Sequence, residues 1–207
     1  FLMDGEDAES HKGIQNYVKA LNHLYKSENA LFACDDNASG FEWVNATAAN
    51  ESIVSFLRKT EKEEDTLLVV CNFTPVAHRD YGVGVPYAGV YKEIFCSDFE
   101  QFGGDGSMNV TARQSRKIAA DDRERSISIG LAPLSMSIFK LERKMTDKEE
   151  EQATKSVKKS VDKKASTTKA AAKKNAGTKK VAKKTVAKKV VDTKTTIKKS
   201  GAIKKDK

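Results

Sequence analysis

Residues 67–91 read LLVVCNFTPVAHRDYGVGVPYAGVY, and this stretch decides the fold class. It begins with an apolar strand that ends at Pro75, because proline has no backbone N–H to donate to a sheet. A polar connector follows, then a short strand around Val83, a turn at Pro86 and Gly89, and another strand. Short apolar strands separated by turn residues are typical of all-β proteins.

Further strand-like segments flank this stretch on both sides. Ile127, Ile129 and Leu131 alternate with small or polar residues, which is the pattern of a strand with one buried face. Thr66–Phe73 is the most apolar segment, so we predict that it is a central strand. About seven short strands with turns between them predict an antiparallel β-sandwich. They are Gly40–Asn45, Glu51–Lys59, Thr66–Phe73, Val83–Val85, Val90–Phe95, Ser126–Leu131 and Leu134–Leu141.

One helix is predicted before the strands, beginning at Ser10 and ending near residues 27–29. Ser10 can cap the helix, because its hydroxyl can accept a hydrogen bond from a free backbone N–H of the first turn. The apolar residues that follow recur at helical spacing, and so wide an apolar face must pack on a larger body. These residues are Ile14, Tyr17, Val18, Leu21, Leu24 and Tyr25.

The chain divides near Met145 into two parts of opposite charge. Its 37 Lys and Arg and 29 Asp and Glu give a net charge of +8. Residues 1–145 hold 16 basic and 22 acidic residues (net −6), whereas residues 146–207 hold 21 Lys and 7 acidic residues (net +14). The second part has no aromatic residue, Pro, Cys or Leu, so we expect it to be disordered.

The basic part contains a duplication of 25 residues. When residues 156–180 are aligned with 181–205, the nine lysines of one block fall on the nine of the other. One interpretation is binding to nucleic acid or another polyanion through charge, and the other is an incidental solvated extension. Without Arg or aromatic residues, base-specific recognition is not expected. The candidate polyanion-binding residues are Lys158, Lys159, Lys163, Lys164, Lys183, Lys184, Lys188 and Lys189.

Motifs along residues 1–141 resemble those of 1,4-α-glucan (glycogen) branching enzymes, glycoside hydrolase family 13 of the α-amylase superfamily. The sequence NFTP at 72–75 is followed by Tyr81, by VGVP at 83–86 and by Gly89-x-Tyr91. This run favours branching enzymes over other members of the superfamily, which stay open as an alternative. The other matches are HKGIQ at 11–15, GFEW at 40–43, SFLR at 55–58, SD at 97–98 and FGG at 102–104.

The resemblance implies a domain organisation. Residues 1–32 would be the last helix of a truncated catalytic barrel, and 33–145 would be an amylase-type C-terminal all-β domain. Residues 146–207 would be a disordered extension outside the family pattern. Because the chain begins without Met, we expect it to be part of a longer protein, with the barrel preceding it or supplied by another chain.

The resemblance also implies a function. Branching enzymes transfer an α-1,4-glucan segment to a 6-hydroxyl and so form the α-1,6 branches of glycogen. The reaction needs two carboxylates, which project from barrel strands in this family. No barrel strand is visible in the sequence, so we assign no catalytic residue and expect this chain alone to be inactive. The implied partner is an α-1,4-glucan or glycogen.

Aromatic side chains can stack on sugar rings, and four of them are candidates for a glucan-binding surface. They are Trp43, Tyr81, Tyr87 and Tyr91, of which Tyr87, beside Pro86, is predicted to be the most exposed. The alternative, which we favour, is that these rings pack in the core or at its rim.

The remaining signals concern cofactors and localisation. Cys34, Cys71 and Cys96 lack the spacing of metal ligands, and we interpret them as reduced thiols of a cytoplasmic protein. No metal site and no cofactor are predicted. No apolar run is long enough to span a membrane, so no membrane partner is expected.

Overall fold

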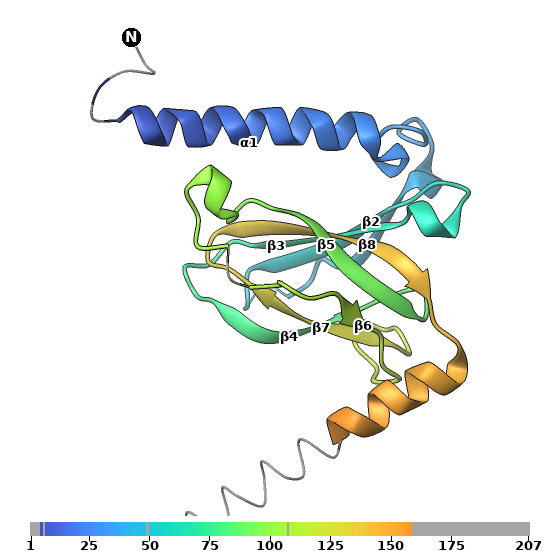
Figure 1. The fold of residues 1–207 in the computed structure, drawn as a ribbon. Helices are drawn as coiled ribbons and strands as arrows, with labels where there is room; N and C mark the ends of the chain where they lie inside the picture. The colour runs from blue at the N-terminus through green and yellow to red at the C-terminus, as the bar shows by residue number, and fades with distance from the viewer. Residues whose placement is uncertain (1–4, 6, 49, 107, 159–207) are drawn as a thin grey trace, which may run out of the picture. The chain divides into compact units, whose positions relative to one another are not determined.

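The computed structural model describes residue 5 and residues 7–48, 50–106 and 108–158. Helix α1 (Ala8–Ser27) lies over one face of a six-stranded sheet, and a two-stranded sheet lies on the other side (Figure 1). The strand orders are β1-β2-β3-β8-β5-β6 and β4-β7, with every pair antiparallel. The predicted all-β sandwich preceded by a helix is confirmed. The strands are β1 (Phe41–Asn45), β2 (Ile53–Arg58), β3 (Leu67–Asn72), β4 (His78–Gly84), β5 (Gly89–Cys96), β6 (Arg113–Gln114), β7 (Ser126–Leu131) and β8 (Ser135–Lys144); the short 3-10 helices are Asn29–Leu31, Ala38–Gly40, Glu63–Asp65 and Glu100–Phe102.

Strand β3 is central, as its apolar sequence predicts. It lies between β2 and β8 and alternates between two separate cores. Leu68 and Val70 belong to the core between the two sheets, whereas Leu67 and Val69 belong to the core beneath α1. A strand that is buried on both faces has no polar side, which is why the segment shows no alternation.

Strands β4 and β6 differ from the prediction. Only Val83–Val85 was expected to be a strand, but β4 begins at His78 and pairs with β7. Its first half carries exposed polar residues such as Arg79 and Asp80, so only its buried end reads as apolar. Strand β6 has two residues and is not among the predicted strands, because so short a strand leaves no periodic pattern.

Helix α1 is held against the larger sheet by aromatic packing. The Tyr17 ring lies 5.7 Å from that of Phe95 and 5.4 Å from that of Phe102, measured between ring centroids. Gly13 allows this approach, since a Cβ atom there would lie 2.9 Å from the carbonyl oxygen of Phe102. The helix begins two residues before the predicted Ser10, with Asp7 as its first flanking residue.

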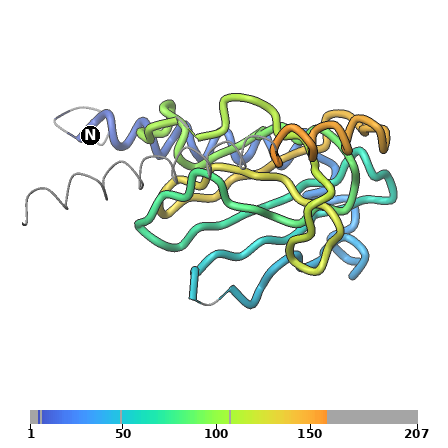
Figure 2. Tube along the Cα trace, turned by 90° about the horizontal axis from the view of Figure 1, so that it is seen from below, coloured from blue at the N-terminus to red at the C-terminus, as the bar shows by residue number. Residues whose placement is uncertain are grey.

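A second helix occupies residues 147–158, where the sequence predicted the start of a disordered extension. This helix is shown in orange at the end of the molecule away from the N-terminus of α1 (Figures 1 and 2). Residues up to Val157 form one compact unit with the sheets. This compact unit extends twelve residues past the boundary of 145 that the sequence predicts for the all-β domain, and the rest of the extension lies outside the described residues.

Candidate docking surface

One side of α1 is apolar and is not covered by the sheet. Ile14, Val18 and Tyr25 have exposed fractions of 63%, 49% and 52%. Residues spaced by four or seven lie on the same side of a helix, so these three form a stripe. The adjacent side packs on the sheet through Tyr17 and Leu24. The wide apolar face that the sequence predicts is thus divided between a buried side and an open one.

A groove of about 480 Å³ runs beside this stripe, between α1 and the larger sheet. Phe56, Val69 and Ile138, from three adjacent strands, give it an apolar lining. Arg58 supplies a polar border, where its Nη2 atom lies 2.6 Å from the Asp35 carboxylate. The other lining residues are Leu21, Asn22, Leu24, Tyr25, Leu31 and Met136.

An aromatic ridge continues the groove onto the edge strand β1. The Phe41 ring centroid lies 4.9 Å from that of Trp43 and 5.3 Å from that of Phe56. Trp43 is opposite Phe56 in the strand pairing and is 55% exposed. Because Phe56 also lines the groove, ridge, groove and stripe adjoin one another. We call Ile14, Val18, Tyr25, Phe41, Trp43 and Phe56, with the groove, the open apolar face.

The other side of β1 fixes the ridge in place through charged contacts. Glu42 accepts a hydrogen bond of 2.5 Å from Lys59 Nζ and forms an ion pair with Arg123. The hydrogen bond from Lys59, together with the positive charge of Arg123, lowers the pKa of the Glu42 carboxyl below its usual value. Asn45 donates to Asp121 Oδ1 at 2.7 Å. These contacts hold an edge strand that has a partner on one side only.

The four aromatic candidates from the sequence lie in different surroundings. Tyr91 is 1% exposed and donates its hydroxyl to the Tyr87 carbonyl at 2.9 Å, so it cannot meet a sugar at the surface. Burial raises its pKa. Tyr81 and Tyr87 are half-buried against the inter-sheet core. The expectation that Tyr87 is the most exposed of the four is wrong, because Trp43 is.

The predicted polyanion-binding lysines lie almost entirely beyond the described residues. Lys158 is described and exposed at the end of the second helix. Lys159, Lys163, Lys164, Lys183, Lys184, Lys188 and Lys189 lie outside the described residues.

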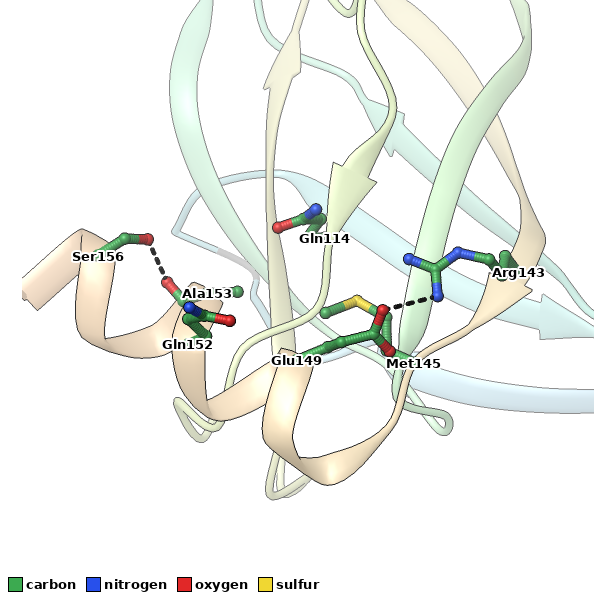
Figure 3. A pocket seen from close by; sticks show the side chains of 7 residues that line it. All are labelled: Gln114, Arg143, Met145, Glu149, Gln152, Ala153 and Ser156. Atoms are coloured by element: carbon green, nitrogen blue, oxygen red, sulfur yellow. Dashed lines mark hydrogen bonds and ion pairs between the residues drawn. The ribbon is translucent and has the colours of Figure 1, made fainter.

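The second helix leaves a small hollow of about 290 Å³ against β6 and β8 (Figure 3). Gln114 and Arg143 come from the strands, and Glu149, Gln152 and Ser156 from the helix. Two of its polar groups are already engaged: Arg143 donates to Glu149 Oε1 at 3.1 Å, and Ser156 donates to the Ala153 carbonyl at 2.8 Å. The contact between Arg143 and Glu149 joins the helix to β8, whereas the Ser156 hydrogen bond lies within the helix.

No group of three His, Cys, Asp or Glu side chains that could hold a metal ion is found among the described residues. None of the helices in this part of the chain is long and apolar enough to cross a membrane.

Comparison with known families shows which domain the sandwich is similar to. The family described as alpha amylase, C-terminal all-beta domain, matches residues 43–142. The match covers the strands of the sandwich from Trp43 onwards and excludes both α1 and the second helix. The described residues contain no parallel strand pair, so a catalytic barrel is not part of them.

The chain is similar to curated enzymes named 1,4-alpha-glucan branching enzyme GlgB. It is 41% identical over 133 residues to the enzyme of Synechococcus elongatus, covering 64% of this chain and 17% of the relative. It is 41% identical over 134 residues to that of Halothermothrix orenii, covering 65% and 21%. For Trichodesmium erythraeum the identity is 40% over 138 residues, covering 67% and 18%. The chain thus spans about a fifth of the length of these relatives.

Sequence reasoning missed the second helix and the residues that hold it. A signal was present, because Thr146 and Glu149 have the spacing of a capping box. In the structure the Thr146 backbone N–H donates to Glu149 Oε2 at 2.7 Å, and the Glu149 N–H donates to Thr146 Oγ1 at 3.4 Å. Averaging the composition over residues 146–207 concealed this local start signal.

Proposed function

We propose that this chain is the non-catalytic C-terminal part of a 1,4-α-glucan branching enzyme. The likeness to branching enzymes over 64% of the chain supports this, as does the absence of a parallel barrel from the described residues. The reaction of the whole enzyme would transfer an α-1,4-glucan segment to a 6-hydroxyl. Its two carboxylates would belong to the barrel, and no residue of this chain is assigned to catalysis.

The observation that carries this proposal is the open apolar face. A large apolar surface on a folded domain is typical of an interaction site. Here it combines a helix stripe with an aromatic ridge on either side of a groove. We propose that its occupant is the catalytic barrel that branching enzymes have and the described residues lack. In this arrangement α1 would be shared, with one side on the β-sandwich and the other on the barrel.

Activity measurements test the first part of the proposal. The chain alone is incubated with amylose, and the absorbance of the iodine complex is followed over time. We expect no fall in absorbance. A clear fall would show that catalytic groups lie within this chain and would overturn the proposal.

A chimaera tests the docking face. This chain replaces the matching segment of the Halothermothrix orenii enzyme, and branching activity and thermal stability are measured. We expect Ile14→Asp to lower both by placing a charge in an apolar interface. Gln15→Asp adds the same charge at a neighbouring exposed position of α1 and should change little. Equal losses in the two variants would contradict the assignment of the stripe to the interface.

A second candidate function concerns the basic extension, for which we propose polyanion binding. The observation that favours it is the duplicated lysine register of residues 156–205, in a segment of net charge +14 attached to a part of net charge −6. Deleting residues 159–207 should abolish retention of the chain on heparin at moderate salt. Unchanged retention would exclude the extension as the binding element.

We propose that the protein acts in the cytoplasm, where a branching enzyme would meet its glucan. Three free cysteines agree with a reducing compartment. Intact activity of the parent enzyme in strong reductant would agree with this localisation, and inactivation would argue against it.

A further inference from the structure

One end of the sandwich carries three large apolar side chains that are open to solvent. Phe73, Val76 and Leu134 have exposed fractions of 64%, 57% and 69%. The first two lie in the connection between β3 and β4, and Leu134 lies in the turn between β7 and β8. The Leu134 N–H donates to the Thr74 carbonyl at 2.8 Å, so the two connections adjoin. We call Phe73, Val76 and Leu134 the apolar tip.

The buried side chain of Asn72 holds the apolar tip in shape. Its amide nitrogen donates to the carbonyl oxygens of Val76 and Ala132, both at 2.8 Å. Its amide oxygen accepts from the Thr74 N–H at 3.0 Å and from the Thr74 hydroxyl at 2.7 Å. One side chain thus joins both connections, and a fully paired polar network of this kind is rigid. A preformed surface loses little conformational entropy when it meets a partner.

Leu134 adopts a backbone conformation that its Cβ atom disfavours. Its φ angle is +48°, in the left-handed region that suits glycine. Burial of the side chain does not offset this strain, because the side chain is largely exposed. The hydrogen bond to Thr74 comes from the backbone, and a glycine could donate it without the strain. Strain combined with exposure indicates that the leucine side chain serves a partner rather than the fold of the sandwich.

The apolar tip lies at the end of the sandwich where α1 begins. Asn72 and Ser135 are opposite each other at this end of β3 and β8. Strand β5 ends at the same place, beside the start of β8, and leads into the 3-10 helix Glu100–Phe102. The first half of α1 packs there, with the Asn16 side chain donating to the Gln101 carbonyl at 3.5 Å. The helix therefore starts at the end that carries the tip (Figure 1).

The tip also continues the open apolar face. Met136 lines the groove of that face and is opposite Cys71 in the pairing of β3 with β8. Both side chains pack in the core beneath α1. Alternate residues of a strand point to the same side of a sheet. Phe73 and Leu134 follow Cys71 and Met136 by two residues in the direction of the tip, so they extend the same apolar surface beyond the groove.

This position has a meaning if α1 contacts a catalytic barrel as the proposed function states. In such a barrel each helix begins beside the C-terminal ends of the strands, where the βα-loops form the active site. The start of α1 would therefore mark the catalytic face of the barrel. The apolar tip lies at that end of the sandwich, whereas the groove lies beside the second half of the helix, at Leu21, Leu24 and Tyr25.

We propose that the apolar tip packs against a βα-loop of the catalytic barrel and that Phe73 and Leu134 are positioning residues for the branching reaction. The proposal rests on the proposed function and adds a contact that reaches the catalytic face. An apolar loop fits the tip better than a glucan does, because sugar hydroxyls need hydrogen-bonding partners. The nearby Thr74 hydroxyl is already engaged by Asn72.

Thermal denaturation of Leu134→Gly in the full chain tests whether the β-domain itself needs the leucine. Glycine adopts a positive φ angle without a steric penalty, so we expect the melting temperature to stay the same or to rise. A fall in the melting temperature would show that the side chain stabilises this chain, and it would overturn the proposal.

The same substitution in the chimaera with the Halothermothrix orenii enzyme tests positioning. We expect kcat for the branching of amylose to fall about tenfold with KM unchanged, because a displaced loop misplaces the catalytic groups. Phe73→Ala should act in the same direction. The matched control is Ile118→Ala, which shortens an exposed apolar residue whose carbonyl accepts from Ser126 at the start of β7, away from the tip. It should leave kcat unchanged.

An unchanged kcat in both tip variants would overturn the contact with a barrel loop. A raised KM with unchanged kcat would place the tip on the glucan, which overturns the proposal as well. Ile14→Asp in the same chimaera separates these failures from failure of the proposed function. If Ile14→Asp lowers activity and the tip variants do not, only the assignment of the tip fails. If Ile14→Asp has no effect, the docking of α1 on the barrel fails.

Discussion

The two helices of this protein rest on the same sandwich by opposite physical means. Helix α1 packs through apolar and aromatic side chains, including Tyr17 and Leu24, and leaves a second apolar side open. The helix at 147–158 is held by Glu150, Thr154 and ion pairs to the domain. An apolar helix surface can also pack against another apolar partner. A buried carboxylate is stable only where its cation and its hydrogen-bond donor lie. The comparison assigns docking to α1 and anchoring to the second helix.

The largest loss of stability is expected when a buried aromatic ring on which α1 packs is removed. Phe95→Ala deletes a buried ring that meets both Tyr17 and Phe102. The free energy of unfolding, measured by denaturant titration, should fall by about 3 kcal/mol or more. Ile14→Ala, on the open side of the same helix, should change it by less than about 0.5 kcal/mol in this chain. Similar losses from both would mean that the two sides of α1 are not distinct.

A smaller effect is expected from the anchor of the second helix. Glu150→Ala leaves Arg125 and Ser115 without their shared partner, and we expect a loss of about 2 kcal/mol in the free energy of opening of this helix. Hydrogen exchange of the helix amides measures this quantity directly. The amides of α1 should keep their protection. Equal loss of protection in both helices would show that they open as one unit.

The smallest effect is a pH dependence confined to the second helix. Hydrogen bonds from the Thr146 backbone and hydroxyl lower the pKa of Glu149 in the folded state. A lowered folded pKa means that the capping contribution is present above the ordinary carboxyl pKa and is lost as pH falls through the lowered value. Protection of the helix against hydrogen exchange should therefore decrease on acidification.

The matched control for this pH dependence is Glu149→Gln. An amide keeps the shape of the side chain but has no carboxyl to titrate, so the decrease should become shallower. The same pH profile in Glu149→Gln would assign the effect to other acidic groups of the helix.

Much of the sandwich could be predicted from the sequence, because local residue patterns indicate where most of its strands lie. Ser126–Leu131 alternates strictly and is β7 with the same bounds. Strand β4 was shortened in the prediction because its exposed half is polar. The docking surface could be predicted only in part: the wide apolar face of α1 was visible, but which side the sheet would cover was not. Trp43 and Tyr91 are both aromatic residues of predicted strands, so the sequence does not distinguish them. In the structure Trp43 is on the surface and Tyr91 is in the core.

The sequence by itself determined the all-β class, the central position of Thr66–Phe73, the family motifs and the division of charge near Met145. Each of these depends on neighbouring residues or on composition. Only the tertiary structure decided that a helix beyond residue 145 packs on the sandwich. The reason is that Glu150 is buried through Ser115 and Arg125, which lie far from it in the chain. From its sequence alone, an acidic helix is expected to be exposed to solvent. The cations that pair with it come from distant parts of the chain and are visible only in the folded structure.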